Sequence, residues 1–305
     1  MNSKASILST LVYFDLFHYP ITAGEIRFFL PQRISPAELE RSLGELLESG
    51  LVFMWEGFYT IRNEQGLVER RRKGNRRAAD MLHTAEKVAA LLARFPYIRG
   101  VGVSGSLSKH YADEGSDIDL FIITAKNRLW LARTFLHALK KLSFIVRRED
   151  WFCMNYFVDE LALEIPEKNM YTAIEIVTLI PMQGGTAFAD FAEANRWTDR
   201  VLPQSIERRT IRGGRRVPIL TRALEVLLDN ALGDVLDGWL MRLTARRWAR
   251  KTLAGRKNNR GVLMSLAAGK HSARPEPGEF QKGLLQAYER KRRELLEGLG
   301  VYKTL

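Results

Sequence analysis

The sequence predicts an α+β fold in three consecutive units: a small unit of helices and a hairpin over 1–66, a core of strands and helices over 67–200, and a basic helical unit over 201–305. Three observations lead to this prediction. The length of 305 residues is about twice that of one ordinary domain. Helical spacing of apolar residues gives way to a buried strand near Ile98. The last third carries 22 Lys and Arg against 10 Asp and Glu, an excess equal to the +12 of the whole chain.

The composition limits the class of protein. Hydrophobic residues make up 46% of the chain and charged residues 27%, which is typical of a globular protein. The longest uncharged run, Ile176 to Ala189, is too short to span a bilayer and contains Pro181. Cys153 is the single cysteine, which excludes an internal disulfide and a multi-cysteine zinc site. With no signal-peptide pattern at the N-terminus, we expect a cytoplasmic protein without a transmembrane segment.

The first 66 residues predict three helices and a hairpin. Helices are expected over Ile7–Phe17 and Thr22–Leu30, and a third begins at the capping box Ser35–Glu38 and ends at Gly50. Two strands, 51–55 and 58–61, follow around a tight turn. This pattern resembles a winged helix-turn-helix. The third helix, however, carries four glutamates and one arginine, so it would repel DNA phosphates. We therefore expect packing or protein contact rather than DNA reading.

The central segment places a glycine turn shortly before two aspartates. After a basic stretch from Arg70 and a helix that ends near Pro96, we expect a strand over Ile98–Ser104 and a turn at Gly105–Ser106. A short helix over Leu107–Ala112 and a second strand over Asp117–Thr124 follow. The sequence thus predicts a strand, a turn, a helix and a strand within 27 residues.

The aspartates and the turn have complementary chemistry. Asp117 and Asp119 are two positions apart on a strand, so their side chains should lie on one face while Ile118 is buried. Two adjacent carboxylates repel each other unless a cation lies between them, and oxygen ligands suit Mg²⁺. Gly105 allows close approach of the backbone, and Ser106 begins a helix whose free N–H groups favour a phosphate. One element is therefore expected to bind metal and the other an anion.

This segment resembles the signature of the DNA polymerase β-like nucleotidyltransferase superfamily, which has an apolar strand, Gly-Ser, about ten residues, and then Asp-x-Asp. The resemblance covers roughly residues 80–165. It implies a small mixed sheet flanked by helices, and a nucleoside triphosphate bound with Mg²⁺ or Mn²⁺. It also implies that Gly105 and Ser106 hold the triphosphate and that Asp117 and Asp119 bind the metal. Lys109 either reaches a phosphate or is merely solvated.

Other proteins also contain Asp-x-Asp. Glycosyltransferases do, but that interpretation gives no reason for Gly-Ser one short helix upstream. A calcium loop needs later ligands such as a bidentate glutamate, whereas the residues after Asp119 predict a strand. The two halves of the motif together favour the nucleotidyltransferase interpretation.

The sequence departs from the superfamily pattern at the third carboxylate. After a helix over Arg128–Leu142, strands are expected over 144–146 and 151–158, and the equivalent strand position carries Asn155. Asparagine can coordinate a metal but cannot accept a proton at neutral pH. Glu164, returning beside Asn155 across a hairpin, is the candidate substitute. The sequence leaves three alternatives open: Glu164 substitutes, two carboxylates suffice, or catalysis is reduced.

The last third predicts helices with a basic surface. A helix over 171–179 is followed by a long helical stretch over 220–253 with bends at Gly233 and Gly238, loops over 257–260 and 272–278, and a final helix over 279–299. Arg242, Arg246 and Arg250 share one helical face, with Trp239 and Trp248 interleaved. This stripe predicts binding of RNA or another polyanion; the alternatives are a solvated face and a membrane surface.

The favoured function is a Mg²⁺-dependent nucleotidyltransferase that moves a nucleotidyl group to an unidentified acceptor, which is RNA, protein or a small molecule. The intact Gly-Ser and Asp-x-Asp favour this chemistry. The competing class is a non-catalytic protein that binds nucleotide or nucleic acid on the same fold, and Asn155 favours it. The acidic third helix weakens a third class, a nucleic-acid-binding regulator.

Overall fold

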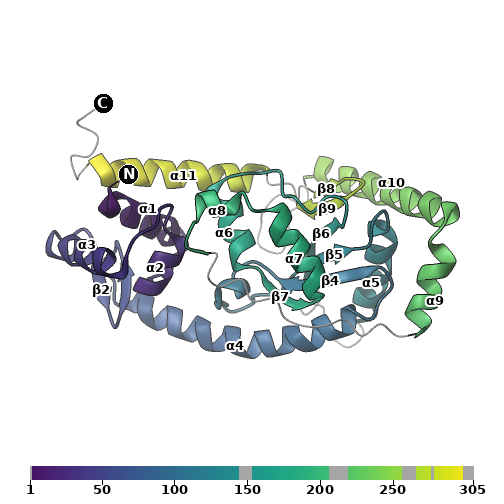
Figure 1. Cartoon of the computed structure of the whole chain (residues 1–305), viewed down its shortest axis with the longest axis horizontal. Coiled ribbons are helices and arrows are strands. Elements are labelled where there is room, and N and C mark those ends of the chain that lie inside the picture. The colour runs from purple at the N-terminus through teal and green to yellow at the C-terminus, as the bar shows by residue number, and fades with distance from the viewer. Residues whose placement is uncertain (1, 144–152, 206–218, 256–265, 276–277, 298–305) are drawn as a thin grey trace.

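The computed structural model describes residues 2–143, 153–205, 219–255, 266–275 and 278–297. It is a mixed α/β structure with an elongated outline (Figure 1). A small helical unit lies at one end, and a mixed β-sheet with helices on both faces forms the rest. This mixture of helices and a mixed sheet is compatible with the α+β class predicted from the sequence.

The N-terminal unit has the predicted three helices and a hairpin. Its elements are α1 (Ser3–Asp15), β1 (Ile21–Thr22), α2 (Ala23–Phe29), α3 (Pro36–Glu48), β2 (Phe53–Trp55) and β3 (Phe58–Thr60). The strands form a small antiparallel sheet in the order β1-β3-β2. Side-chain oxygens of Thr22 and Ser35 cap α2 and α3, because each accepts a hydrogen bond from a backbone N–H in the first turn of its helix.

The long helix α4 (Gly66–Leu92) connects this unit to the core and runs along one side of the molecule (Figure 1). The basic stretch from Arg70 lies inside α4 rather than ahead of it. Buried Arg71 pairs with Glu25 of the N-terminal unit at 2.6 Å. The Tyr19 hydroxyl of the same unit donates to the carbonyl of Lys109 in the core at 2.9 Å. These contacts hold the N-terminal unit against the core.

The core is a six-stranded sheet in the order β7-β4-β5-β6-β9-β8. Its elements up to residue 205 are β4 (Ile98–Val103), η1 (Leu107–Lys109), β5 (Asp119–Thr124), α5 (Leu129–Ser143), β6 (Cys153–Asp159), α6 (Met170–Thr178), β7 (Ile180–Gln183), α7 (Gly185–Ala194) and α8 (Thr198–Val201). β5 and β6 are parallel and the other pairs are antiparallel, so the sheet is mixed.

Alternate residues of β5 face two separate cores. Leu120 and Ile122 pack with α4 and α5 on one side, and Phe121 and Ile123 pack with Phe188 of α7 on the other. All four are at most 5% exposed. This two-sided burial explains why the sequence of β5 after Asp119 is a continuous apolar run rather than an alternating one.

The C-terminal third corrects two predictions. It comprises α9 (Ile219–Leu228), α10 (Ala231–Leu253), β8 (Leu266–Ala268), β9 (Ser272–Pro275) and α11 (Gly278–Glu297). The prediction of a loop over 272–278 is wrong, because β9 pairs with β6 and β8 in the core sheet. The predicted long helix breaks before Gly233, where Asn230 caps α10. The predicted segments 144–146 and 257–260 lie outside the described residues.

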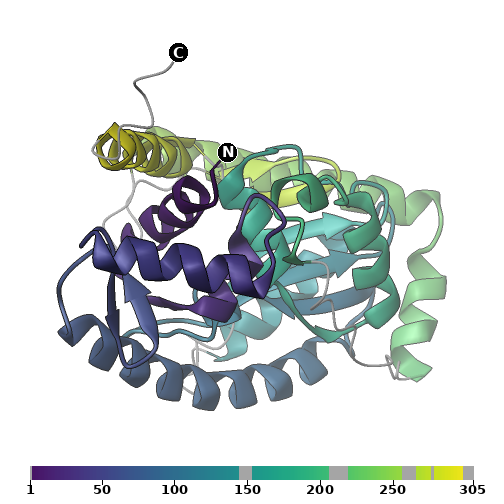
Figure 2. The same ribbon diagram turned by 60° about the vertical axis from the view of Figure 1, so that its left-hand side comes forward.

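Helix α11 returns the chain to its beginning. It lies beside α1 in both views (Figures 1 and 2), and Tyr288 contacts Tyr13 edge to face at 6.1 Å between ring centroids. The buried carboxylate of Asp15 binds Arg62 at 2.6 Å and also Lys291. The last described helix therefore packs on the N-terminal unit.

Among the described helices, none combines the length and the apolar character needed to cross a membrane.

Candidate active site

The turn after β4 lies directly against the first residue of β5. Gly105 has φ +68°, a left-handed conformation that favours glycine. A Cβ atom at Gly105 would lie 2.6 Å from Oδ2 of Asp119, so any side chain there would displace the carboxylate. The Ser104 N–H donates to the Asp119 carbonyl at 2.9 Å and holds the two strands together at this point. The sequence needs glycine here for both conformation and space.

Three side chains converge next to this turn. One ligand atom from each of Asp117, Asp119 and Cys153 lies within 4.8 Å of the others, and all three side chains are partly buried. Asp117 precedes the first hydrogen-bonded residue of β5, so this strand begins two residues later than predicted. The expectation that the two aspartates lie together nevertheless agrees with this geometry.

Cys153 is the residue of the cluster that was given no role in the site from the sequence. It pairs with Asp119 across parallel strands β5 and β6. Burial raises the pKa of the Cys153 thiol well above its usual range, and the charge of Asp119 and a hydrogen bond to Asp117 raise it further. The thiol is therefore protonated at neutral pH and donates toward the carboxylates. A single cysteine with no motif around it gives little signal in the sequence.

Asn155, the predicted third position, is two residues farther along β6. Leu120 pairs with Met154 and Phe121 with Tyr156, so β6 has one extra residue at Asn155. This irregularity is a β-bulge, and it changes the face of the sheet toward which the following side chains of β6 point. The side chain of Asn155 lies outside the described part of the chain.

Glu164, the predicted substitute base, is not among the three side chains that converge in the cluster. Its side chain is 54% exposed and pairs with Lys168 at 2.5 Å. Residues 161–165 form an irregular connection to α6 and no strand. The hairpin that was to return Glu164 beside Asn155 is therefore not formed.

Lys109 is held by the protein rather than solvated. Its Nζ donates to Glu175 Oε1 at 2.7 Å and to the Gly105 carbonyl at 3.0 Å. Lys109 thus holds the Gly105 carbonyl in place and connects the turn to Glu175 of α6. Ser106 is exposed, and η1 is a single turn that ends at Lys109, shorter than the predicted helix.

Tyr171 of α6 is a further polar group whose hydroxyl is affected by the charge of Asp119. Burial raises its hydroxyl pKa, and the charges of Glu175 and Asp119 raise it further. Tyr171 therefore stays protonated and able to donate.

Next to Lys109, a cavity of about 620 Å³ extends along β7; its lining includes Ser108, Thr178, Gln183, Phe28 and Phe188. The cavity offers aromatic and polar surface beside the turn.

The structure separates the aromatic residues of the predicted polyanion stripe. Arg242, Arg246 and Arg250 are exposed on α10, as the helical spacing predicted. Trp239 is 52% exposed, but Trp248 is buried against Trp130 with ring centroids 6.0 Å apart. Trp248 therefore belongs to the core and cannot stack on a base.

The acidic helix α3 of the N-terminal unit has partners within its own unit. Glu45 pairs with Lys4 of α1, and Glu38 accepts a hydrogen bond from Ser3 at 2.5 Å. These contacts join α3 to α1. They support packing as the role of the acidic residues at these two positions.

A scan against models of protein families, a search among curated proteins and a search among solved structures find no match to this chain. The resemblance to the nucleotidyltransferase superfamily therefore rests on the residues and the geometry described above.

Proposed function

We propose that this chain is a metal-dependent nucleotidyltransferase that uses the cluster beside Gly105. The observation that carries the proposal is the contact between the glycine turn and Asp119, with Asp117 close by. A turn without a side chain and a pair of carboxylates are the two parts that hold a triphosphate and its cation in the superfamily that the sequence resembles. Fourteen positions separate Gly105 from Asp119 in the chain, yet they touch.

The donor set fits Mg²⁺ in part. Asp117 and Asp119 supply hard carboxylate oxygens, which suit Mg²⁺ or Mn²⁺, whereas the protonated thiol of Cys153 is a poor ligand for either ion. Asp117 and Asp119 would hold the metal, and Cys153 would orient the Asp117 carboxylate by donating to it. When bound, the metal would neutralise charge on the phosphates during transfer.

The proposed reaction is attack on the α-phosphorus of a nucleoside triphosphate. An acceptor hydroxyl or phosphate oxygen forms a bond to that phosphorus, the bond to the bridging oxygen breaks, and pyrophosphate leaves. A proton lost from an acceptor hydroxyl passes to solvent, because Cys153 is protonated and Glu164 is ion-paired and outside the cluster, so neither is suited to accept it. We propose that the cavity along β7 binds either the acceptor or the nucleobase of the triphosphate.

The position of the transferred label distinguishes nucleotidyl transfer from phosphoryl transfer. The protein is incubated with cell extract, Mg²⁺ or Mn²⁺, and each nucleoside triphosphate labelled either at the α- or at the γ-phosphate. We expect α-label, and not γ-label, on a macromolecular or small-molecule product. Transfer of γ-label would instead identify a phosphoryl transferase and contradict the proposal.

A second candidate is a protein on the same fold that binds nucleotide without transferring it. Cys153, which pairs with Asp119, favours this alternative because the third side chain of the cluster is a thiol rather than a carboxylate. Nucleotide binding that depends on Asp119 but gives no labelled product with any of the triphosphates would support it.

A further inference from the structure

One face of α10 carries large apolar and basic side chains that point away from the rest of the chain. Leu232, Val235 and Trp239 are 67%, 65% and 52% exposed. Spacing of three and four residues continues the same face into the exposed arginines. On α9, Val226 and Leu227 are also exposed. We define the α9–α10 outer face by these residues: Val226, Leu227, Leu232, Val235, Trp239, Arg242, Arg246 and Arg250.

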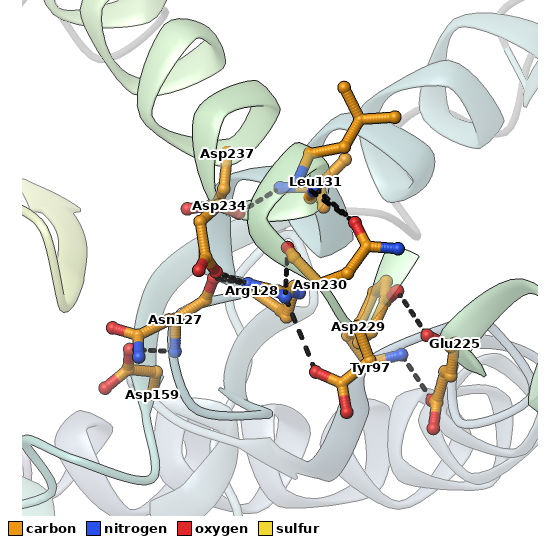
Figure 3. Close-up of polar contacts among 12 residues, drawn as sticks. Tyr97, Asn127, Arg128, Leu131, Asp159, Glu225, Asp229, Asn230, Asp234 and Asp237 are labelled. Carbon is orange, nitrogen blue, oxygen red and sulfur yellow. Dashed lines mark hydrogen bonds and ion pairs between the residues drawn. The ribbon is translucent and has the colours of Figure 1, made fainter. Parts of the chain in front are cut away.

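The inner side of the same helices is fixed by polar contacts with the core (Figure 3). Arg128 of the core is 4% exposed and pairs with Asp234 and, at 3.4 Å, with Asp229. Asp237 accepts a hydrogen bond from the Leu131 N–H at 2.8 Å, and Glu225 accepts one from the Tyr97 N–H at 2.6 Å.

These contacts set the rotation of both helices. Because Asp237 and Trp248 of α10 are buried against the core, residues on the opposite side of the helix must face outward. The exposure of the apolar side chains is therefore a consequence of how the helices are anchored. Clustered exposed apolar residues of this size mark a surface that binds a partner.

The chemistry of the α9–α10 outer face selects among partners. A polynucleotide would neutralise the arginines but leave Leu232 and Val235 against a polar backbone. A second copy of this chain would bury the apolar residues but bring like charges of the two basic stripes near each other. An anionic lipid bilayer satisfies both halves, because hydrocarbon lies beneath a layer of phosphate groups.

We propose that the α9–α10 outer face docks on an anionic lipid bilayer. The apolar side chains enter the boundary between headgroups and acyl chains, and the three arginines bind headgroup phosphates. This surface is distinct from the candidate active site: α9 contacts Tyr97 just before β4, whereas Gly105 follows the other end of that strand. The inference does not depend on the proposed function.

Vesicle flotation tests the proposal with the full chain. Vesicles of phosphatidylcholine alone are compared with vesicles that also contain phosphatidylglycerol. Two variants are used: Val235→Ser with Trp239→Ser, and Arg242→Gln with Arg246→Gln and Arg250→Gln. Matched controls replace exposed residues elsewhere, Met54→Ser with Leu161→Ser and Arg290→Gln with Arg293→Gln. Circular dichroism establishes that each variant is folded.

We expect the wild type to float with anionic vesicles only. Each outer-face variant should lower binding at least about tenfold, and the controls should bind like wild type. Wild-type binding should also persist partly at high salt, since apolar insertion is not screened.

Three results would overturn the proposal. The first is that the wild-type protein does not float with anionic vesicles, regardless of the results for the variants. The second is binding to a polynucleotide that the arginine variant loses and the Val235 and Trp239 variant keeps, without vesicle binding. The third is a dimer in solution that the Val235 and Trp239 variant abolishes, again without vesicle binding.

Discussion

Cys153 pairs with Asp119 across the parallel strands β5 and β6, and its sulfur lies within 4.8 Å of the carboxylate oxygens of Asp117 and Asp119. The cluster therefore has two hard oxygen donors and one thiol. In the superfamily that the sequence resembles, a third carboxylate on a later strand completes the set. The thiol is the feature of this site that sets it apart, and it leads to the first prediction.

Replacing Cys153 by aspartate should strengthen Mg²⁺ binding. The substitution adds a third hard ligand at a position already beside the other two. We expect isothermal titration calorimetry to show a lower Kd for Mg²⁺ in Cys153→Asp than in wild type, and label transfer to be retained or raised. Cys153→Ser, which adds no carboxylate, is the control. Equal Mg²⁺ affinity in all three proteins would show that residue 153 does not border the metal.

Gly105→Ala should damage the site beyond its effect on backbone strain. Gly105 and Gly115 both have positive φ, but only at Gly105 would a Cβ atom meet Asp119, at 2.6 Å from Oδ2. Each alanine should cost about 1 kcal/mol of unfolding free energy from the left-handed conformation. Gly105→Ala should in addition weaken Mg²⁺ binding, measured by calorimetry. Similar Mg²⁺ affinity in the two variants would contradict the close contact.

Glu164→Gln should leave transfer unchanged. The structure places this carboxylate at the surface in an ion pair with Lys168, and it is not one of the three side chains of the cluster. An initial-rate comparison with wild type over a range of pH tests this, because loss of a general base would also remove a limb of the pH profile. A large loss of rate in Glu164→Gln would contradict this prediction and indicate that Glu164 takes part in catalysis.

Asp15→Asn should destabilise the contact between α1 and α11 at neutral pH. Burial alone would raise the pKa of Asp15, but hydrogen bonds from Arg62 and Lys291 outweigh it and lower the pKa below its usual value. A lowered carboxyl pKa stabilises the fold above the unfolded-state pKa, and this stabilisation disappears as pH falls through the folded-state value. We expect a loss of about 2 kcal/mol at neutral pH.

Urea unfolding at neutral pH and at about pH 3 measures this difference. The gap between wild type and Asp15→Asn should narrow at the lower pH. Asp113→Asn is the control, since its ion pair with Arg70 is exposed and should contribute under about 1 kcal/mol. A gap that stays constant with pH would mean that the charge of Asp15 has no stabilising role.

Local signals account for the parts that the sequence predicted well. The caps at Thr22 and Ser35 and the turn at Gly105 depend on neighbours within a few residues, so their residue types are sufficient. The approach of Gly105 to Asp119 follows from the antiparallel pairing of β4 and β5, because Gly105 comes just after the end of β4 and Asp119 begins β5. These features do not require knowledge of the distant parts of the chain.

Long-range packing accounts for what the sequence could not predict. The neighbour of Asp119 on β6 depends on strand register, and one extra residue at Asn155 is enough to change it. Strand β9 is short and pairs with β6, more than a hundred positions earlier, so its residues carry no alternation to recognise. Trp239 and Trp248 look alike in the sequence, and only the anchoring of α10 shows which one is buried.

The central claim is that Asp119 binds the catalytic metal, and the most direct test compares Asp119→Asn with Glu114→Gln. Glu114 is an exposed carboxylate in the same connection and pairs with Arg77 at 3.2 Å. We predict that Asp119→Asn abolishes transfer of α-label, whereas Glu114→Gln keeps it. In metal-free buffer the thermal midpoint of Asp119→Asn should be unchanged or raised, because repulsion from Asp117 is relieved. Near-wild-type transfer of α-label by folded Asp119→Asn would contradict the account.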